Sequence, residues 1–205
     1  MQILMISGSR NREGRTARSI GAIGQGFIKA GGNSECIFLP ELNIERCRQC
    51  DPDGSGVCMR EHRCIIEDDF ASIVTKLEAA DAVVFASPVY FIDLSESLRS
   101  FLERLRRVKG PPKPLPGGIL RAARPGATPA VGLCLAGSGG GGAVNCCLIL
   151  EKIMQECGFD VVDMIPVRRQ NLEFKLPLLQ LTGEWLVTKP ASGQRSPTVP
   201  EATPH

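Results

Sequence analysis

The chain has 205 residues, of which 43% are hydrophobic, and this size and composition suit one domain with a single core. A net charge of +2 gives no reason to expect binding to nucleic acid or to a membrane surface. No apolar run reaches the roughly 20 residues that cross a bilayer. Because Met1 leads straight into an apolar run without a secretory signal, we expect a cytoplasmic protein whose nine cysteines are reduced thiols or metal ligands.

Five short apolar runs alternate with helical patterns along the chain. The expected strands cover residues 2–6, 35–39, 82–86, 130–135 and 161–165, and the expected helices cover residues 15–30, 69–79, 95–107, 143–157 and, near the end, 176–188. This alternation predicts an α/β fold with a doubly wound parallel sheet and helices on both faces. In the first helix the inward stripe is expected to be Ile20, Ile23, Phe27 and Ile28.

Residues 1–188 are expected to form this domain, with a cysteine-rich loop inserted at 43–66 and a Pro/Gly/basic loop at 108–128. The tail 189–205 has four prolines and few apolar residues, so we expect it to be disordered. We interpret the acidic residues Glu67, Asp68 and Asp69 as N-terminal caps of the expected helix 69–79. We expect the basic residues of helix 95–107 to form a solvated face. Contact with a phosphate of NADPH and an oligomer interface are the alternatives.

Three loops at expected strand ends have unusual compositions. The loop after the first strand combines Ser and Gly with the start of a helix, which is typical of a phosphate site. The loop after the third strand, 88–91, carries a proline and two aromatic residues beside which a planar ring can lie. The loop after the fourth strand, 137–142, is nearly all glycine, so its backbone can approach a ring edge. Since ligands of such sheets bind at the carboxyl ends of the strands, the three loops together favour FMN.

The segments Ile6–Asn11 with Thr16, and Ala86–Phe91, resemble those of the NAD(P)H-dependent FMN reductases and the iron-sulfur flavoproteins, which have a flavodoxin-like fold. The resemblance covers about residues 1–165 and implies the strand order 2-1-3-4-5. By this resemblance, the phosphate would be surrounded by Ser9, Arg10, Arg15 and Thr16. The flavin ring would be lined by Pro88, Val89, Tyr90 and Phe91, with Gly137, Ser138 and Gly139 on its other side.

Four cysteines lie within 18 residues at the spacing C-x2-C-x7-C-x5-C, namely Cys47, Cys50, Cys58 and Cys64. Four thiolates this close in sequence can enclose a 4Fe–4S cluster or a zinc ion, and unliganded thiols are the third reading. In the iron-sulfur flavoproteins a compact cysteine run occupies this place. The other five cysteines, in apolar segments, are expected to be small core residues: Cys36, Cys134, Cys146, Cys147 and Cys157.

These features predict an FMN-dependent oxidoreductase that transfers electrons from NAD(P)H to a quinone, a flavin or a redox protein, with a 4Fe–4S cluster as a second centre if the cysteine loop binds one. No side chain is assigned as a catalytic acid or base, because the cofactor carries the chemistry. In related flavoproteins the region 108–128 helps to form a dimer, so a homo-oligomer is expected. Two alternatives remain open: a flavodoxin-type electron carrier that does not use NAD(P)H, and a zinc-binding module without flavin.

Overall fold

The structure is a computed structural model that describes residues 1–52, 56–109 and 126–188. Its centre is a parallel sheet with the order β2-β1-β3-β4-β5, which confirms the predicted fold class and strand order. The strands are β1 (Gln2–Ser7), β2 (Asn33–Phe38), β3 (Ala82–Pro88), β4 (Pro129–Ala136) and β5 (Asp160–Arg168). The expected loop 108–128 and the tail 189–205 lie largely or wholly outside the described residues.

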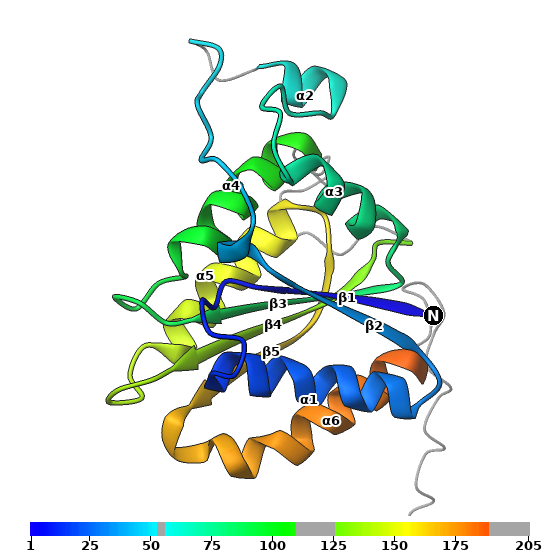
Figure 1. The fold of residues 1–205 in the computed structure, drawn as a ribbon, viewed down its shortest axis with the longest axis vertical. Helices are drawn as coiled ribbons and strands as arrows, with labels where there is room; N and C mark the ends of the chain where they lie inside the picture. The colour runs from blue at the N-terminus through cyan, green and yellow to red at the C-terminus, as the bar shows by residue number, and fades with distance from the viewer. Residues whose placement is uncertain (53–55, 110–125, 189–205) are drawn as a thin grey trace, which may run out of the picture.

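Helices cover both faces of the sheet (Figure 1). One face carries α1 (Arg15–Lys29) and α6 (Leu172–Thr188), and the other carries α3 (Phe70–Ala79), α4 (Glu96–Lys109) and α5 (Ala143–Glu156). The short α2 (Val57–Glu61) lies beyond α4, within the cysteine-bearing loop, and two 3₁₀ turns cover Leu39–Glu41 and Arg169–Asn171. Among the described helices, none is long and apolar enough to span a membrane.

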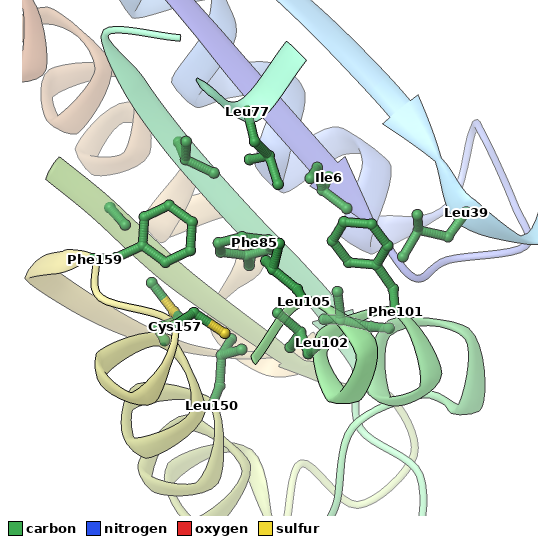
Figure 2. Packing of buried hydrophobic residues seen from close by; sticks show 14 of the residues in the cluster. Ile6, Leu39, Leu77, Phe85, Phe101, Leu102, Leu105, Leu150, Cys157 and Phe159 are labelled. Carbon is green, nitrogen blue, oxygen red and sulfur yellow. The ribbon is translucent and has the colours of Figure 1, made fainter. Parts of the chain in front are cut away.

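The apolar runs of the central strands serve two cores at once. Along β1, Leu4 and Ile6 face the core under α3, α4 and α5, whereas Ile3 and Met5 face the core under α1 and α6. Figure 2 shows the first core, where side chains of the sheet, α4 and α5 meet around Phe85. Because successive side chains of a strand point to opposite faces, a strand covered on both sides is continuously apolar.

The helices α1 and α6 approach each other through glycines. A Cβ atom on Gly26 would lie 1.9 Å from the carbonyl oxygen of Gln180, and one on Gly183 would lie 2.0 Å from that of Ile23. Two ion pairs, Arg18 with Glu173 at 2.9 Å and Lys29 with Glu184 at 2.8 Å, flank this contact. The glycines therefore set how close the two backbones come.

Several local expectations were wrong. Ile28 is 55% exposed, because it lies about 100° around α1 from the buried Phe27. Cys36 is only partly buried, since β2 is an edge strand. The final helix begins at Leu172 rather than 176 and continues through Pro177, and the stretch expected to be irregular contains α2.

Candidate functional site

The first loop, residues 8–14, joins β1 to α1 and is held by its own side chains. The Ser9 hydroxyl accepts a hydrogen bond from the backbone N–H of Asn11 at 3.3 Å, and the Asn11 side-chain oxygen accepts one from the N–H of Glu13 at 2.8 Å. Gly14 is the N-cap of α1, which has no side-chain cap and no acidic residue in its first turn among the described residues. The N–H groups and the positive end of α1 are therefore available to an anion.

The four predicted phosphate residues fall into two pairs. Ser9 is 7% exposed and Thr16 is 3% exposed, so both residues are buried. Arg10 and Arg15 are exposed, and Arg10 makes only a distant ion pair with Glu96, at 3.9 Å. Both arginines can therefore reorient toward an anion at this loop.

The second loop, residues 89–95, is a tight turn with a strained backbone. Tyr90 and Asp93 exchange two backbone hydrogen bonds of 3.0 and 2.9 Å, and the two residues between them have positive φ angles, 51° at Phe91 and 67° at Ile92. Bulky residues rarely adopt this conformation, and such strain is concentrated at functional sites. Phe91 is fully exposed and Tyr90 is half exposed, so the turn projects aromatic surface from the sheet edge.

The third loop, residues 137–142, packs against the second. A Cβ atom on Gly142, whose φ is 80°, would lie 3.2 Å from Cα of Ile92 and 3.3 Å from Cγ1 of Val89. By contrast, a Cβ atom on Gly137 or Gly139 would have no described protein atom within 4 Å. Gly142 thus allows the second and third loops to pack closely, while Gly137 and Gly139 border a space that no described protein atom fills.

The first and second loops are also in direct contact. A Cβ atom on Gly8 would lie 2.1 Å from the Ser95 hydroxyl oxygen, and the Ser97 hydroxyl donates to the carbonyl oxygen of Gly8 at 3.3 Å. The Ser95 hydroxyl is buried and has no hydrogen-bond partner among the described residues. The three loops lie on one side of the molecule, at the carboxyl ends of β1, β3 and β4 (Figure 1).

This arrangement suits the parts of FMN. The uncapped start of α1 with two buried hydroxyls matches a phosphate, the projecting aromatic turn matches the face of a ring, and the open glycine backbone matches a ring edge that takes N–H donors. The structure therefore brings together the three loops that the sequence singled out. The individual roles of their residues stay predictions.

The four cysteines of the loop 43–66 border one cavity of about 30 Å³, which lies beside the C-terminal half of α4. Cys50 is exposed, whereas Cys47, Cys58 and Cys64 are partly buried. No three Cys, His, Asp or Glu side chains of the described ranges lie close enough together to hold a metal ion as they stand. The set of donors suits a cluster or zinc, but their present spacing does not, so metal binding would require the thiols to move closer.

A buried ion pair closes this cavity toward the core. The side chain of Arg104 is 1% exposed and that of Asp68 is 0% exposed, and their two contacts measure 2.6 and 3.0 Å. Arg104 also donates to the carbonyl oxygen of Glu45 at 2.9 Å and to Sγ of Cys64 at 3.4 Å, and its guanidinium lies 4.2 Å from the ring centre of Phe70. One side chain thus contacts both ends of the cysteine loop.

The pKa values of the pair reflect this burial and pairing. Burial by itself would raise the pKa of Asp68, but hydrogen bonds from Arg104 and from the N–H groups of Glu45 and Phe70 outweigh it and hold the pKa below its ordinary value. For Arg104, burial lowers the pKa, but the bonds to Asp68 and Cys64 outweigh it and raise the pKa. Both groups are therefore charged at neutral pH.

The Arg104–Asp68 pair corrects two expectations. The basic residues of α4 are not all a solvated face, because Arg104 is among the largest fully buried side chains. Asp68 does accept the N–H of Phe70 at 3.1 Å, as a cap would, but its carboxylate is chiefly paired with Arg104, and Asp69 at the N-cap position makes no capping bond. The position of Arg104 in the apolar stripe Phe101, Leu105, Val108 was the signal in the sequence that could have revealed this.

The other cysteines are mostly core residues, as expected. Cys134, Cys146, Cys147 and Cys157 are buried. Burial raises the pKa of Cys157 to about 12 and that of the partly buried Cys36 to about 11. His62 is exposed, and its Nδ1 atom lies 2.9 Å from the carbonyl oxygen of Val108.

Curated relatives and solved structures resemble this chain. An iron-sulfur flavoprotein of Methanocaldococcus jannaschii is 30% identical over 109 residues, which are 53% of this chain and 54% of the relative. One of Methanosarcina thermophila is 29% identical over 104 residues, 51% of this chain and 52% of the relative. The chain therefore spans about half the length of the curated relatives that it matches.

Among solved structures, an NAD(P)H:quinone oxidoreductase from Methanothermobacter marburgensis superimposes with a TM-score of 0.63 at 18% identity, covering 91% of this chain and 97% of the other. A flavone reductase superimposes with a TM-score of 0.64 at 16% identity, covering 92% of this chain and 62% of the other. At such identities the likeness shows the fold alone. The family signature of the NADPH-dependent FMN reductases matches residues 1–171, and this chain belongs to that family.

Proposed function

We propose that this protein binds FMN at the three loops and transfers electrons from NAD(P)H to a quinone, a flavin or a redox protein. The observation that carries the proposal is the contact of the second loop with both others, through Gly8 and Ser95 on one side and Gly142 and Ile92 on the other. The bound isoalloxazine ring would supply the redox chemistry. The protein would hold the phosphate at α1 and fix the ring between the second and third loops.

Isothermal titration tests the binding site. Thr16→Val keeps the shape of a buried side chain but removes its hydroxyl, so FMN should bind about 5–30-fold more weakly, the equivalent of about 1–2 kcal/mol. Riboflavin, which lacks the phosphate, should bind the variant and the wild type equally. Thr75→Val, at an exposed position on α3, is the matched control and should leave both affinities unchanged.

Stopped-flow mixing with NADPH and with NADH under anoxic conditions tests the activity. Bleaching of the flavin absorbance would support the reductase. If the protein binds FMN but neither nucleotide bleaches it, it is a flavodoxin-type carrier. A colourless zinc protein that does not bind FMN would instead favour the zinc-binding alternative.

We further propose that Cys47, Cys50, Cys58 and Cys64 hold a 4Fe–4S cluster. Support comes from their shared cavity, from the Arg104 donor at Cys64, and from the names of the matched relatives. Helix α4 would link the two centres, since Glu96 at its start lies 3.9 Å from Arg10 of the first loop and position 104 lies about 12 Å further along the helix. Iron, sulfide and zinc analysis after anoxic purification separates a cluster from zinc and from free thiols.

A homo-oligomer is also proposed, with the apolar surface beside the second loop as its interface. Phe91 and Ile92 on this loop, and Val144 and Leu148 on α5, are about half to fully exposed, and Ile92 contacts Gly142 at the start of α5. Exposed apolar residues that gather in this way are typical of interaction surfaces. Light scattering of Leu148→Glu should show a smaller species than the wild type, whereas the equally helical Thr75→Glu should not.

A further inference from the structure

The outward face of α6 carries a stripe of large apolar side chains that stays exposed in the described structure. Phe174 is 71% exposed, Leu181 57%, Leu178 44% and Trp185 43%. The opposite face of the helix packs against α1 and β5. A helix that is apolar on both sides is typical of one that is covered on both sides, yet α6 runs along the margin of the molecule (Figure 1). The stripe therefore lacks a partner within the described chain.

The spacing of this α6 stripe is that of a seam between two helices. Its four residues are separated by four, three and four positions, as the a and d positions of a coiled coil are, and they lie within about 60° of one another around the helix. A stripe this narrow fits one facing helix. Its order is the same in both directions, aromatic, leucine, leucine, aromatic, so a copy of the helix that runs the opposite way matches it at every position.

We propose that the α6 stripe is an interface for a second copy of this chain, with the two α6 helices antiparallel about a two-fold axis. In such a contact, residue i of one copy meets residue j of the other, and the reverse. Phe174 then faces Trp185 of the second copy, and Leu178 faces Leu181. This interface is separate from the apolar surface beside the second loop, and it does not depend on a bound cofactor.

The charges beside the stripe favour a second copy as the occupant. On the side toward α1, Arg18 pairs with Glu173 at one end of the stripe and Lys29 pairs with Glu184 at the other. An antiparallel copy brings the first ion pair of one chain opposite the second ion pair of the other, so the facing charges balance. By contrast, helices that lie on a membrane surface are rich in Lys and Arg, and α6 has one lysine and two glutamates.

The size of the surface fits the apolar core of an interface with a polar rim. The exposed parts of the four side chains amount to roughly 400 Å² on each copy, about half of the roughly 800 Å² that each partner buries in a standard interface. The ion pairs at its sides extend this area as a rim. The tail 189–205, which follows α6, has no aromatic residue and only Val199 as a large aliphatic one, so it offers no comparable apolar segment.

Two complementary substitutions test the pairing by light scattering. Phe174→Glu and Trp185→Lys each place a charge in the stripe, so each variant alone should have about half the mass of the wild type. An equimolar mixture of the two variants should recover the wild-type mass. In an antiparallel pair, the introduced glutamate then faces the introduced lysine at one end, and Phe174 still faces Trp185 at the other. Destabilisation of the fold would not be reversed by mixing.

The matched control is Ile28→Glu, which should keep the wild-type mass. Ile28 is also an exposed apolar residue, but it lies about 200° around α1 from Gly26, whose backbone contacts α6. Melting temperature and circular dichroism report that each variant is folded. Leu148→Glu, which disrupts the other proposed interface, should still lose mass when Phe174→Glu is added to it, so the two interfaces are tested independently.

Trp185 is the single tryptophan of the chain, so its fluorescence reports on the stripe directly. Its emission maximum should lie at a shorter wavelength in the wild type than in Phe174→Glu, because the second copy covers the indole. Vesicles of phosphatidylglycerol should leave the wild-type emission unchanged.

Folded variants that both keep the wild-type mass would overturn the inference. Smaller variants whose mixture stays small would also overturn it, because the two positions then do not meet across an antiparallel pair. An emission maximum that is equal in the wild type and in Phe174→Glu, and that shifts only with vesicles, would identify the stripe as a membrane-binding surface instead.

Discussion

Gly8 shows how a single position controls the packing of the first loop against the second. It follows Ser7 at the end of β1, and its N–H donates to the carbonyl oxygen of Ala86 at 2.9 Å, so its backbone lies against β3. On its other side are Ser95 and the start of α4. Any side chain at this position would separate the first loop from the second.

Replacement of Gly8 by alanine should therefore weaken FMN binding. The new Cβ atom would lie 2.1 Å from the Ser95 hydroxyl oxygen and 2.9 Å from Cβ of Leu98, and overpacking of this kind costs about 1–3 kcal/mol. We expect a lower melting temperature and an FMN affinity reduced by about tenfold or more, measured by thermal unfolding and titration. Gly21→Ala, whose added methyl group would have no described atom from outside its own turn of the helix within 4 Å, should stabilise α1 by up to about 1 kcal/mol and leave FMN binding intact. If Gly8→Ala and Gly21→Ala had the same melting temperature and the same FMN affinity, the proposed role of Gly8 in packing the first loop against the second would be contradicted.

At the scale of elements, the pair α1 and α6 covers one face of the sheet, and α1 begins directly after the first loop. The start of α1 is held in place because its buried stripe packs on β1 and its glycine contacts bring α6 close. A disturbance at α6 should therefore reach the first loop through α1, although α6 contributes no predicted flavin residue.

Gly183→Ala tests the close contact of the two helices on which this coupling depends. The added Cβ atom would lie 2.0 Å from the carbonyl oxygen of Ile23, a backbone atom that can move only with the helix, so we expect a loss of about 1–3 kcal/mol in the free energy of unfolding. Urea denaturation gives the value. The exposed Thr188→Ala at the end of the same helix should have little effect, and a stability of Gly183→Ala equal to that of the wild type would show that the helices can separate without cost.

For the whole molecule, FMN should act as a stabilising ligand, because its proposed site joins loops from three strands. Ligand at 100 times its dissociation constant stabilises the folded state by about 2.7 kcal/mol. For a chain of this size, that corresponds to a rise of roughly 5–11 °C in melting temperature. Differential scanning calorimetry with FMN and with riboflavin checks this, and riboflavin at equal concentration should give the smaller rise. An unchanged melting temperature at saturating FMN would exclude a site shared by the three loops.

The stability of the whole molecule should also depend on pH through Asp68. Since its pKa is lowered in the folded state, its stabilising contribution is present above the ordinary aspartate pKa of about 3.9 and is lost as the pH falls through the folded value. Asp68→Asn leaves Arg104 buried without its carboxylate and should cost about 3–5 kcal/mol at pH 7. In urea denaturation across pH 3–7, the difference in the free energy of unfolding between Asp68→Asn and the wild type should become smaller toward pH 3. Asp81→Asn, at an exposed position, serves as the control. If the difference in the free energy of unfolding between Asp68→Asn and the wild type did not depend on pH, the charge pairing of Asp68 with Arg104 would be contradicted.

The sequence by itself determined the sheet, the helices that cover it except for the start of the last one, and the three loops at the strand ends. A short, continuous apolar run such as 82–86 is typical of a strand covered on both faces. Parallel strands bring their carboxyl ends to one edge, so the neighbourhood of loops far apart in the chain follows from the fold class. The cysteine spacing likewise indicated one loop with four thiols.

Only the tertiary structure decided the burial of Arg104 and its pairing with Asp68, because two charged residues 36 positions apart give no pattern that distinguishes a buried pair from two solvated groups. The close approaches of Gly8 to Ser95 and of Gly183 to Ile23 were likewise visible only in the structure. So were the positive φ angles of Phe91 and Ile92. Each depends on which backbones come together when the layers pack. Local periodicity reports the face of an element that is buried, whereas the partner on that face is set by long-range packing.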